Sequence, residues 1–271
     1  VLRLGAVVAV TATAVAGVAV VQNARDSDRG STGPLVTVST PAAKSDRPRP
    51  DQWSYLKGIA VGSSGGVGGM LFGEPDQRRT YERWVSADGT RTATRDKNGR
   101  LRIDPVSSMP GMSPPSGYPY ILKLPTSADA LLAHLDRVLD KEGGRGESTE
   151  ARASRMFQIM EIWMREVAIP ADLRAAMYEA LGRIPGVRFE NRAADVAGRP
   201  GVTFHRFEEG YLRTEIMIDP RTQAYMGYRV VAVRDHVSRG TDGERRIAKG
   251  HILGWGAVVR TAIVDRPGER P

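Results

Sequence analysis

A serine lies among glycines in the pentapeptide GSSGG at residues 62–66, which fits the Gly-x-Ser-x-Gly pattern of serine hydrolases. In those enzymes the serine is the nucleophile of acyl transfer and sits on a sharp turn between a strand and a helix. Here Val-Gly-Gly follows at residues 67–69, and glycine is a poor helix former. The segment also lacks the Lys-Ser or Lys-Thr pair that ends a phosphate-binding loop. We therefore favour a loop between strands over a nucleophile at Ser64, and a serine hydrolase is the least favoured function.

Metal binding and acid–base chemistry need side chains that meet in space, and the chain offers few candidates. It has no cysteine, which excludes thiolate nucleophiles, disulfides and cysteine-based zinc sites. Four histidines are far apart in sequence, without the spacing of a zinc-binding helix: His134, His205, His236 and His251. Glu208 and Glu209 are neighbours near a predicted strand end, so their carboxylates point to opposite sides. The sequence predicts no metal, no cofactor and no catalytic residue, and we do not expect an enzyme.

Methionine and aromatic residues recur at helical spacing between residues 149 and 167. The candidate ligand-binding residues are Met156, Phe157, Met160, Trp163 and Met164. An apolar stripe on a helix usually packs into a core. Thioethers also adapt to varied apolar ligands, so the same face could line a cavity for an acyl chain. Both interpretations stay open at this stage.

Three amphipathic helices are predicted in the middle of the chain. Thr126 or Ser127 caps the first, the second covers residues 149–167, and the third begins at Pro170 and stops at Gly182. Strands are predicted at residues 53–61, 81–87, 90–96, 101–104, 187–191, 202–208, 211–219, 224–234 and 251–265. Strands, then helices, then strands is typical of the α+β class. We expect a curved antiparallel sheet, shaped as a half-barrel and covered by about three helices.

Turn residues support this strand assignment. Asp88-Gly89 and Asn98-Gly99 are typical of tight hairpins, and Asp219-Pro220 predicts another. The proline-rich residues 105–119 are expected to form an exposed loop. Gly254 and Gly256 lie inside the last predicted strand, where glycine usually marks a bulge or a tight curl.

The N-terminal part of the chain predicts an anchor and a linker. Residues 4–21 form an uncharged run of about eighteen residues, long enough for one membrane-spanning helix. The alternative is a cleaved signal peptide, but the run exceeds the usual apolar segment and lacks a clear polar region before a cleavage site. We expect a transmembrane anchor at 1–22, a disordered linker at 23–51 and an extracytoplasmic α+β domain at 52–267. The expected location is the cell membrane, crossed once.

The net charge is +8 and favours anionic partners at long range. The arginines are scattered among acidic and apolar residues, as Arg78, Arg137 and Arg234 illustrate, and they do not form a stripe. Nucleic acid is therefore not an expected partner.

Four short motifs carry a resemblance to a known family. They are Leu124-Pro125-Thr126, Ile184-Pro185-Gly186-Val187, Gly198-Arg199-Pro200-Gly201-Val202 and Glu215-Ile216-Met217-Ile218-Asp219-Pro220. With them, the chain resembles an uncharacterised family of actinobacterial single-span membrane proteins, some of which are encoded near extracytoplasmic-function sigma factors. More remotely, it resembles the LolA-like lipoprotein-carrier fold, a half-open antiparallel barrel closed by helices. That fold also occurs in envelope-stress sensors that bind anti-sigma factors.

Two functions remain as hypotheses. The first is a tethered binding or sensor domain that holds a lipid or a lipoprotein moiety between sheet and helices. The second is a protein-interaction module that regulates a membrane partner such as an anti-sigma factor. It stays open because fold resemblance by itself is weak support for a function.

Overall fold

The computed structural model describes residues 47–61, 78–106, 116–240 and 243–271. The chain divides into two compact units, Val1–Gly30 and Ser31–Pro271, and every described residue belongs to the second. The predicted anchor at 1–22, most of the predicted linker at 23–51 and the loop around Ser64 lie outside the described residues. Among the described helices, none has the length and apolar character needed to span a membrane.

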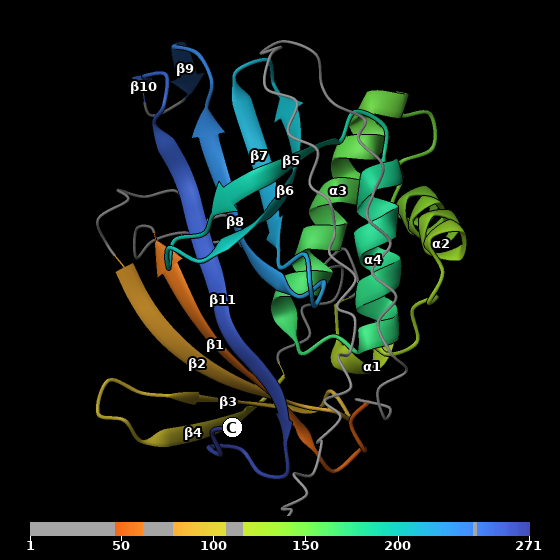
Figure 1. Ribbon diagram of the computed structural model, residues 1–271, viewed down its shortest axis with the longest axis vertical. Coiled ribbons are helices and arrows are strands. Elements are labelled where there is room, and N and C mark those ends of the chain that lie inside the picture. Colours follow the sequence, from red (N-terminus) through yellow and green to blue (C-terminus); the bar gives the residue numbers. More distant parts are fainter. Residues whose placement is uncertain (1–46, 62–77, 107–115, 241–242) are drawn as a thin grey trace, which may run out of the picture. The chain divides into compact units, whose positions relative to one another are not determined.

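The described domain is built on a nine-stranded antiparallel sheet (Figure 1). Its strand order is β4-β3-β2-β1-β11-β8-β7-β6-β5. The strands are β1 (Trp53–Val61), β2 (Arg78–Ser86), β3 (Arg91–Arg95), β4 (Leu101–Pro105), β5 (Arg188–Ala194), β6 (Pro200–Glu208), β7 (Leu212–Ile218), β8 (Tyr225–Ala232) and β11 (Ile252–Val264). The first and last of these strands pair in the middle of the sheet, with Trp53 opposite Val264. The prediction of an α+β fold with a large antiparallel sheet is confirmed.

The described helices lie together on one side of this sheet (Figure 1). They are α1 (Tyr118–Ile121), α2 (Ala128–Lys141), α3 (Thr149–Glu166) and α4 (Ala171–Arg183). Ser148 caps α3, where its hydroxyl oxygen accepts a hydrogen bond from the Ala151 N–H at 3.2 Å. Pro170 sits at the N-cap of α4, as its fixed φ allows.

Two local predictions need correction. The loop expected over residues 105–119 lies mostly outside the described residues, at 107–115, but its ends differ from the expectation. Pro105 closes β4, and helix α1 begins at Tyr118, because Pro119 stands in the first turn, where a helix does not need its missing N–H. No strand was expected between residues 235 and 250, yet β9 (His236–Gly240) and β10 (Gly243–Ile247) pair as a separate hairpin. Its sequence is rich in Arg and Gly, which hides the hairpin from a propensity argument.

The main core lies between the sheet and the helices. Alternation along the strands turns Leu56, Phe204 and Ile216 toward the helices, and all three are buried there. From the helical side, α2, α3 and α4 contribute the other half of the same cluster, including Phe157 and Leu181.

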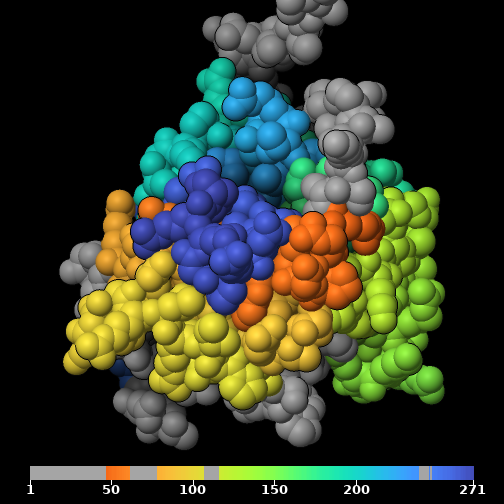
Figure 2. Space-filling view, turned by 90° about the horizontal axis from the view of Figure 1, so that it is seen from below, coloured from red at the N-terminus to blue at the C-terminus, as the bar shows by residue number. Residues whose placement is uncertain are grey.

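The opposite sheet face has a smaller cluster of its own, formed by Trp53, Tyr55, Trp84, Ala93 and Val264. After β11 the chain turns back over this cluster. The Trp84 indole N–H donates to the Glu269 carbonyl at 2.8 Å. The C-terminal segment is seen from below in Figure 2, beside the β3–β4 hairpin and β1.

The turn between β5 and β6 contacts the middle of the sheet. Arg199 reaches past β7 and β8 to β11, where its Nη2 donates to the Val258 carbonyl at 2.7 Å. Asp195 holds this arginine in place, because Arg199 Nε donates a hydrogen bond to Asp195 Oδ2 at 2.7 Å. The target carbonyl lies at a bulge of β11, since Lys57 pairs with Arg260 but Gly58 pairs with Val258.

Candidate functional site

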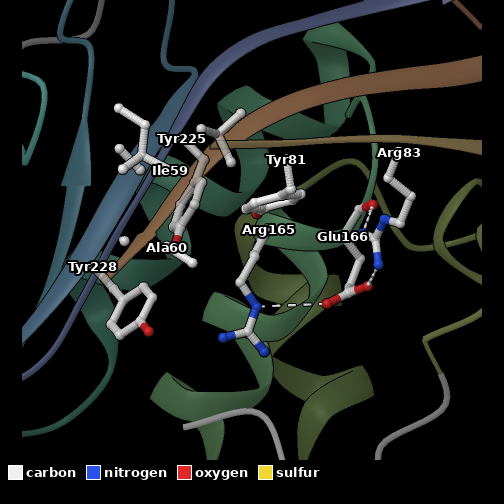
Figure 3. Close-up of a pocket in the computed structure, with 11 residues that line it drawn as sticks. Ile59, Ala60, Tyr81, Arg83, Arg165, Glu166, Tyr225 and Tyr228 are labelled. Atoms are coloured by element: carbon white, nitrogen blue, oxygen red, sulfur yellow. Dashed lines mark hydrogen bonds and ion pairs between the residues drawn. The ribbon is translucent and has the colours of Figure 1, made fainter. Parts of the chain in front are cut away.

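A cavity of about 350 Å³ opens where the last turns of α3 face the central strands β1, β2, β8 and β11. Its lining residues are Ile59, Ala60, Tyr81, Arg83, Arg165, Glu166, Tyr225, Tyr228, Gly256, Ala257 and Val258. The volume lies within the range of small-molecule sites, roughly 300–1,000 Å³. Figure 3 shows the labelled tyrosines and arginines gathered around the same space.

Three tyrosines from two strands form the aromatic part of this wall. Tyr225 and Tyr228 come from β8 and are buried, whereas Tyr81 comes from β2 and is exposed. Two glycines make room for their rings. A Cβ on Gly58 would lie 2.5 Å from the Tyr81 ring, and a Cβ on Gly256 would lie 2.6 Å from the Tyr228 ring. A larger residue at either position would therefore have to displace the ring of Tyr81 or Tyr228 from its place in the wall.

The end of α3 supplies the charged part of the wall. Arg165 lies 3.3 Å from Glu161 and 3.5 Å from Glu166, measured between nitrogen and oxygen. Arg83 reaches Glu166 from β2, with Nη1 and Oε2 2.8 Å apart. Tyr225 donates its hydroxyl hydrogen to Glu161 Oε1 at 2.6 Å. Two guanidinium groups and two carboxylates thus form one connected network.

Burial shifts the titration of this network. It raises the pKa of Glu161, and Arg165 opposes that effect only in part. Burial would also raise the pKa of Glu166, but Arg83 and Arg165 outweigh it and lower that pKa. Burial together with the Glu161 charge raises the pKa of Tyr228 to about 12, so its hydroxyl remains a hydrogen-bond donor at neutral pH.

A second cavity of about 720 Å³ adjoins the first, because Tyr225 and Val258 line both. Arg199, Arg221 and Arg260 are among its lining residues, together with apolar ones such as Val202 and Met226. Both cavities thus combine apolar side chains with arginines. Such a pair of spaces suits a molecule with an apolar body and an anionic head.

The predicted ligand-binding residues of α3 occupy a different place. Met156, Phe157, Met160, Trp163 and Met164 are all buried in the main core. None of them is among the residues that line the two cavities. Trp163 instead packs near the Tyr120 and His134 rings, with centroid separations of 6.0 and 6.3 Å. Ligand binding by these five side chains stays a prediction.

The remaining sequence candidates do not assemble into a reactive site. Among residues 47–61, 78–106, 116–240 and 243–271, no group of three or more His, Asp or Glu side chains could hold a metal ion. His134 bonds to the Tyr120 hydroxyl at 2.7 Å, and His236 stacks on Tyr211 at 3.6 Å. Glu209 has a φ of 50° in the turn that precedes Gly210.

Sequence reasoning missed the residues that line the first cavity. One signal was present, since Tyr81 and Arg83 are two positions apart in a strand and therefore share a face. Their meeting with Arg165 depends on how α3 crosses the sheet, which spacing along the chain does not encode. No protein-family model matches the chain, and a search of curated proteins finds no match to it.

Proposed function

We propose that this chain is a membrane-anchored, extracytoplasmic binding or sensor domain for a small amphipathic molecule, such as a lipid or the acylated end of a lipoprotein. The observation that carries the proposal is the cavity of about 350 Å³ at the end of α3. Ile59, Ala60 and Val258 offer it apolar surface, and the Tyr228 hydroxyl offers a hydrogen-bond donor.

The adjoining arginine-lined cavity supports an anionic head group for the ligand. Guanidinium groups bind carboxylates and phosphates through paired, charge-assisted hydrogen bonds. Arg221 and Arg260 line that cavity, and the first cavity offers the apolar side chains of Ile59, Ala60 and Val258 next to its ion-paired arginines. A fatty acid or a phospholipid combines an apolar body with an anionic head.

The arrangement of elements supports the proposal only at the level of fold. An antiparallel sheet with helices on one side is what the LolA-like resemblance leads one to expect. A half-barrel of that kind and an anchor at residues 1–22 are parts of the proposal. Shared architecture is weak support for a function, and the proposal rests on the residues that line the cavity.

The test is ligand recovery from the full-length chain, followed by binding of a fluorescent fatty acid. We expect lipid to co-purify in proportion to protein and to be identified by mass spectrometry after extraction. Ala60→Phe should fill the cavity and weaken probe binding at least tenfold, since Ala60 lines it. Ala194→Phe is the matched control, because Ala194 is exposed at the end of β5 and outside the lining.

Protein that is repeatedly recovered without lipid and does not bind the probe would contradict the proposal. Equal probe affinity in Ala60→Phe and Ala194→Phe would also contradict it, provided that both variants melt cooperatively.

A second candidate function is regulation of a membrane protein such as an anti-sigma factor. It is favoured by Phe207, which is 42% exposed on the sheet face away from the helices. The Arg188 guanidinium lies 5.3 Å from its ring centroid, and arginine beside an exposed aromatic ring is common at protein interfaces. A stoichiometric protein partner recovered from membranes without lipid, and lost with Phe207→Ala, would favour this function over the first.

A further inference from the structure

The two edges of the nine-stranded sheet differ in character. The edge strand β5 exposes charged side chains at Arg188, Glu190 and Arg192, which is how proteins usually protect an open edge. The other edge strand, β4, exposes Leu101 and Ile103, at 36% and 48%. Val106, just beyond it, is 38% exposed. These are three of the six large apolar side chains exposed in the described part of the chain.

The hydrogen bonds of the β3–β4 pair show which backbone groups face outward. The Val106 N–H donates to the Thr90 carbonyl at 2.9 Å, and the Asp96 N–H donates to the Arg100 carbonyl at 3.0 Å. Hydrogen-bonded pairs alternate along an antiparallel ladder, so the even-numbered residues of β4 face β3. Leu101, Ile103 and Pro105 therefore turn their backbone groups toward the open edge.

The side chains of β4 are complementary to a second copy of the same strand. We propose that two copies of this chain associate by antiparallel pairing of β4 with β4, about a twofold axis at Ile103. In this register Ile103 faces its own copy and exchanges both backbone hydrogen bonds with it. Leu101 faces Pro105 of the other strand, so the N–H that proline lacks falls at the end of the ladder.

Charge selects this register over its neighbours. It places Arg102 opposite Asp104 of the second copy, in a pair without backbone hydrogen bonds, where side chains lie closest. Sliding the strands by two residues in one direction sets Arg102 against its own copy, and sliding in the other direction does the same to Asp104. Arg102 and Asp104 already pair within one strand, with Nε and Oδ2 2.9 Å apart. In the symmetric pairing, the Arg102 and Asp104 side chains of the two copies therefore form one group in which positive and negative charges alternate.

The strand is short, so the expected dimer is weak and depends on concentration. Such isologous contacts are the commonest route to homodimers. Confinement to a membrane surface through the proposed anchor would raise the local concentration of the domain.

The absence of cysteine allows a residue-specific test on the full-length chain. Ile103→Cys should form a disulfide-linked dimer under mild oxidation, because residue 103 meets its own copy at a separation that a disulfide accepts. Leu101→Cys is the matched control on the same strand face and should stay monomeric, because residue 101 faces Pro105. Association through any other part of the chain would not distinguish these two positions.

A charge exchange tests the register. Adding Arg102→Asp to Ile103→Cys should reduce the cross-linked fraction about tenfold, since two like-charged pairs replace two opposite ones. Adding Asp104→Arg as well should restore it. Unchanged melting temperatures would show that these exposed positions leave the fold intact. The proposal is overturned if residues 101 and 103 cross-link equally or if residue 103 does not cross-link. It is also overturned if the charge exchange leaves the cross-linked fraction at residue 103 unchanged.

Discussion

Tyr225 on β8 donates its hydroxyl hydrogen to Glu161 Oε1 on α3 at 2.6 Å and so ties the sheet to the end of the helix that covers it. Tyr225 is buried, and the Glu161 side chain is 13% exposed. Burial raises the pKa of both groups. The bond links α3 to β8, and Tyr225 is itself part of the cavity wall. This one contact therefore bears on stability, on its dependence on pH and on the proposed ligand binding.

Removing the hydroxyl of Tyr225 should destabilise the fold. Tyr225→Phe leaves the partly buried Glu161 without its neutral donor, and the loss of such a bond costs about 1–2 kcal/mol in the free energy of unfolding. Urea denaturation of the domain measures this value. Tyr81→Phe is the matched control, because Tyr81 is exposed, and its change should stay within about 0.5 kcal/mol. An equal effect of both substitutions would contradict the structural role of the bond.

The pKa of Glu161 predicts how stability responds to pH. Because burial raises this pKa in the fold above its ordinary 4.5, the protonated form is favoured, and its contribution to stability is complete below pH 4.5. That contribution is lost as pH rises through the raised value. Tyr225, Arg165 and Glu166 face the group. Glu161→Gln keeps a neutral acceptor, so its stability relative to the wild type should increase above pH 4.5. A constant difference between the two proteins from pH 4.5 to 8 would contradict the prediction.

On the other face of the sheet, the lowered pKa of His205 predicts the opposite dependence of stability on pH. Burial and then the Arg213 charge lower its pKa to about 4 from an ordinary 6.5. Arg188 and Glu190 also face it, and Glu215 is its cross-strand neighbour. Between pH 6.5 and 4 the unfolded chain binds more protons than the fold, so stability should fall as pH falls, by at most about 3 kcal/mol.

The variant His205→Gln should lose that part of the pH dependence. Unfolding free energies of both proteins, measured at intervals from pH 7 to 4, give the comparison. NMR titration of the His205 ring supplies an independent check, and a midpoint near 6.5 would contradict the expected shift.

The predicted ligand-binding face of α3 can be separated from the cavity by substitution. Trp163 is fully buried, so Trp163→Ala should cost about 3–5 kcal/mol. Met160→Leu conserves volume and should cost less than about 1.5 kcal/mol. If these side chains serve packing alone, Met160→Leu leaves the affinity for a fatty-acid probe unchanged, whereas Ala60→Phe weakens it. A lower probe affinity in Met160→Leu at unchanged stability would place Met160 in the binding site.

Most of the elements could be predicted from the sequence because their signals are local. Residues 53–61 were predicted as a strand, and β1 spans Trp53–Val61. Asp88-Gly89 and Asn98-Gly99 specify turns through positive φ at glycine, which is 72° at Gly89 and 76° at Gly99. Glycine inside the last strand predicted irregular pairing, and the register of β11 against β8 shifts between Ile252 and Gly254. These features depend on a few consecutive residues.

What the sequence determined by itself is the class of fold, the apolar faces of its helices and the turns between its strands, since each follows from periodicity or from backbone preference over a short range. Only the tertiary structure decided that β1 and β11 pair, that Arg199 reaches the carbonyl of Val258, and that α3 sets Arg165 beside Tyr228. The candidate site belongs to this second group. Its residues come from strands and a helix far apart in the chain, and long-range packing, which leaves no local pattern, brings them together.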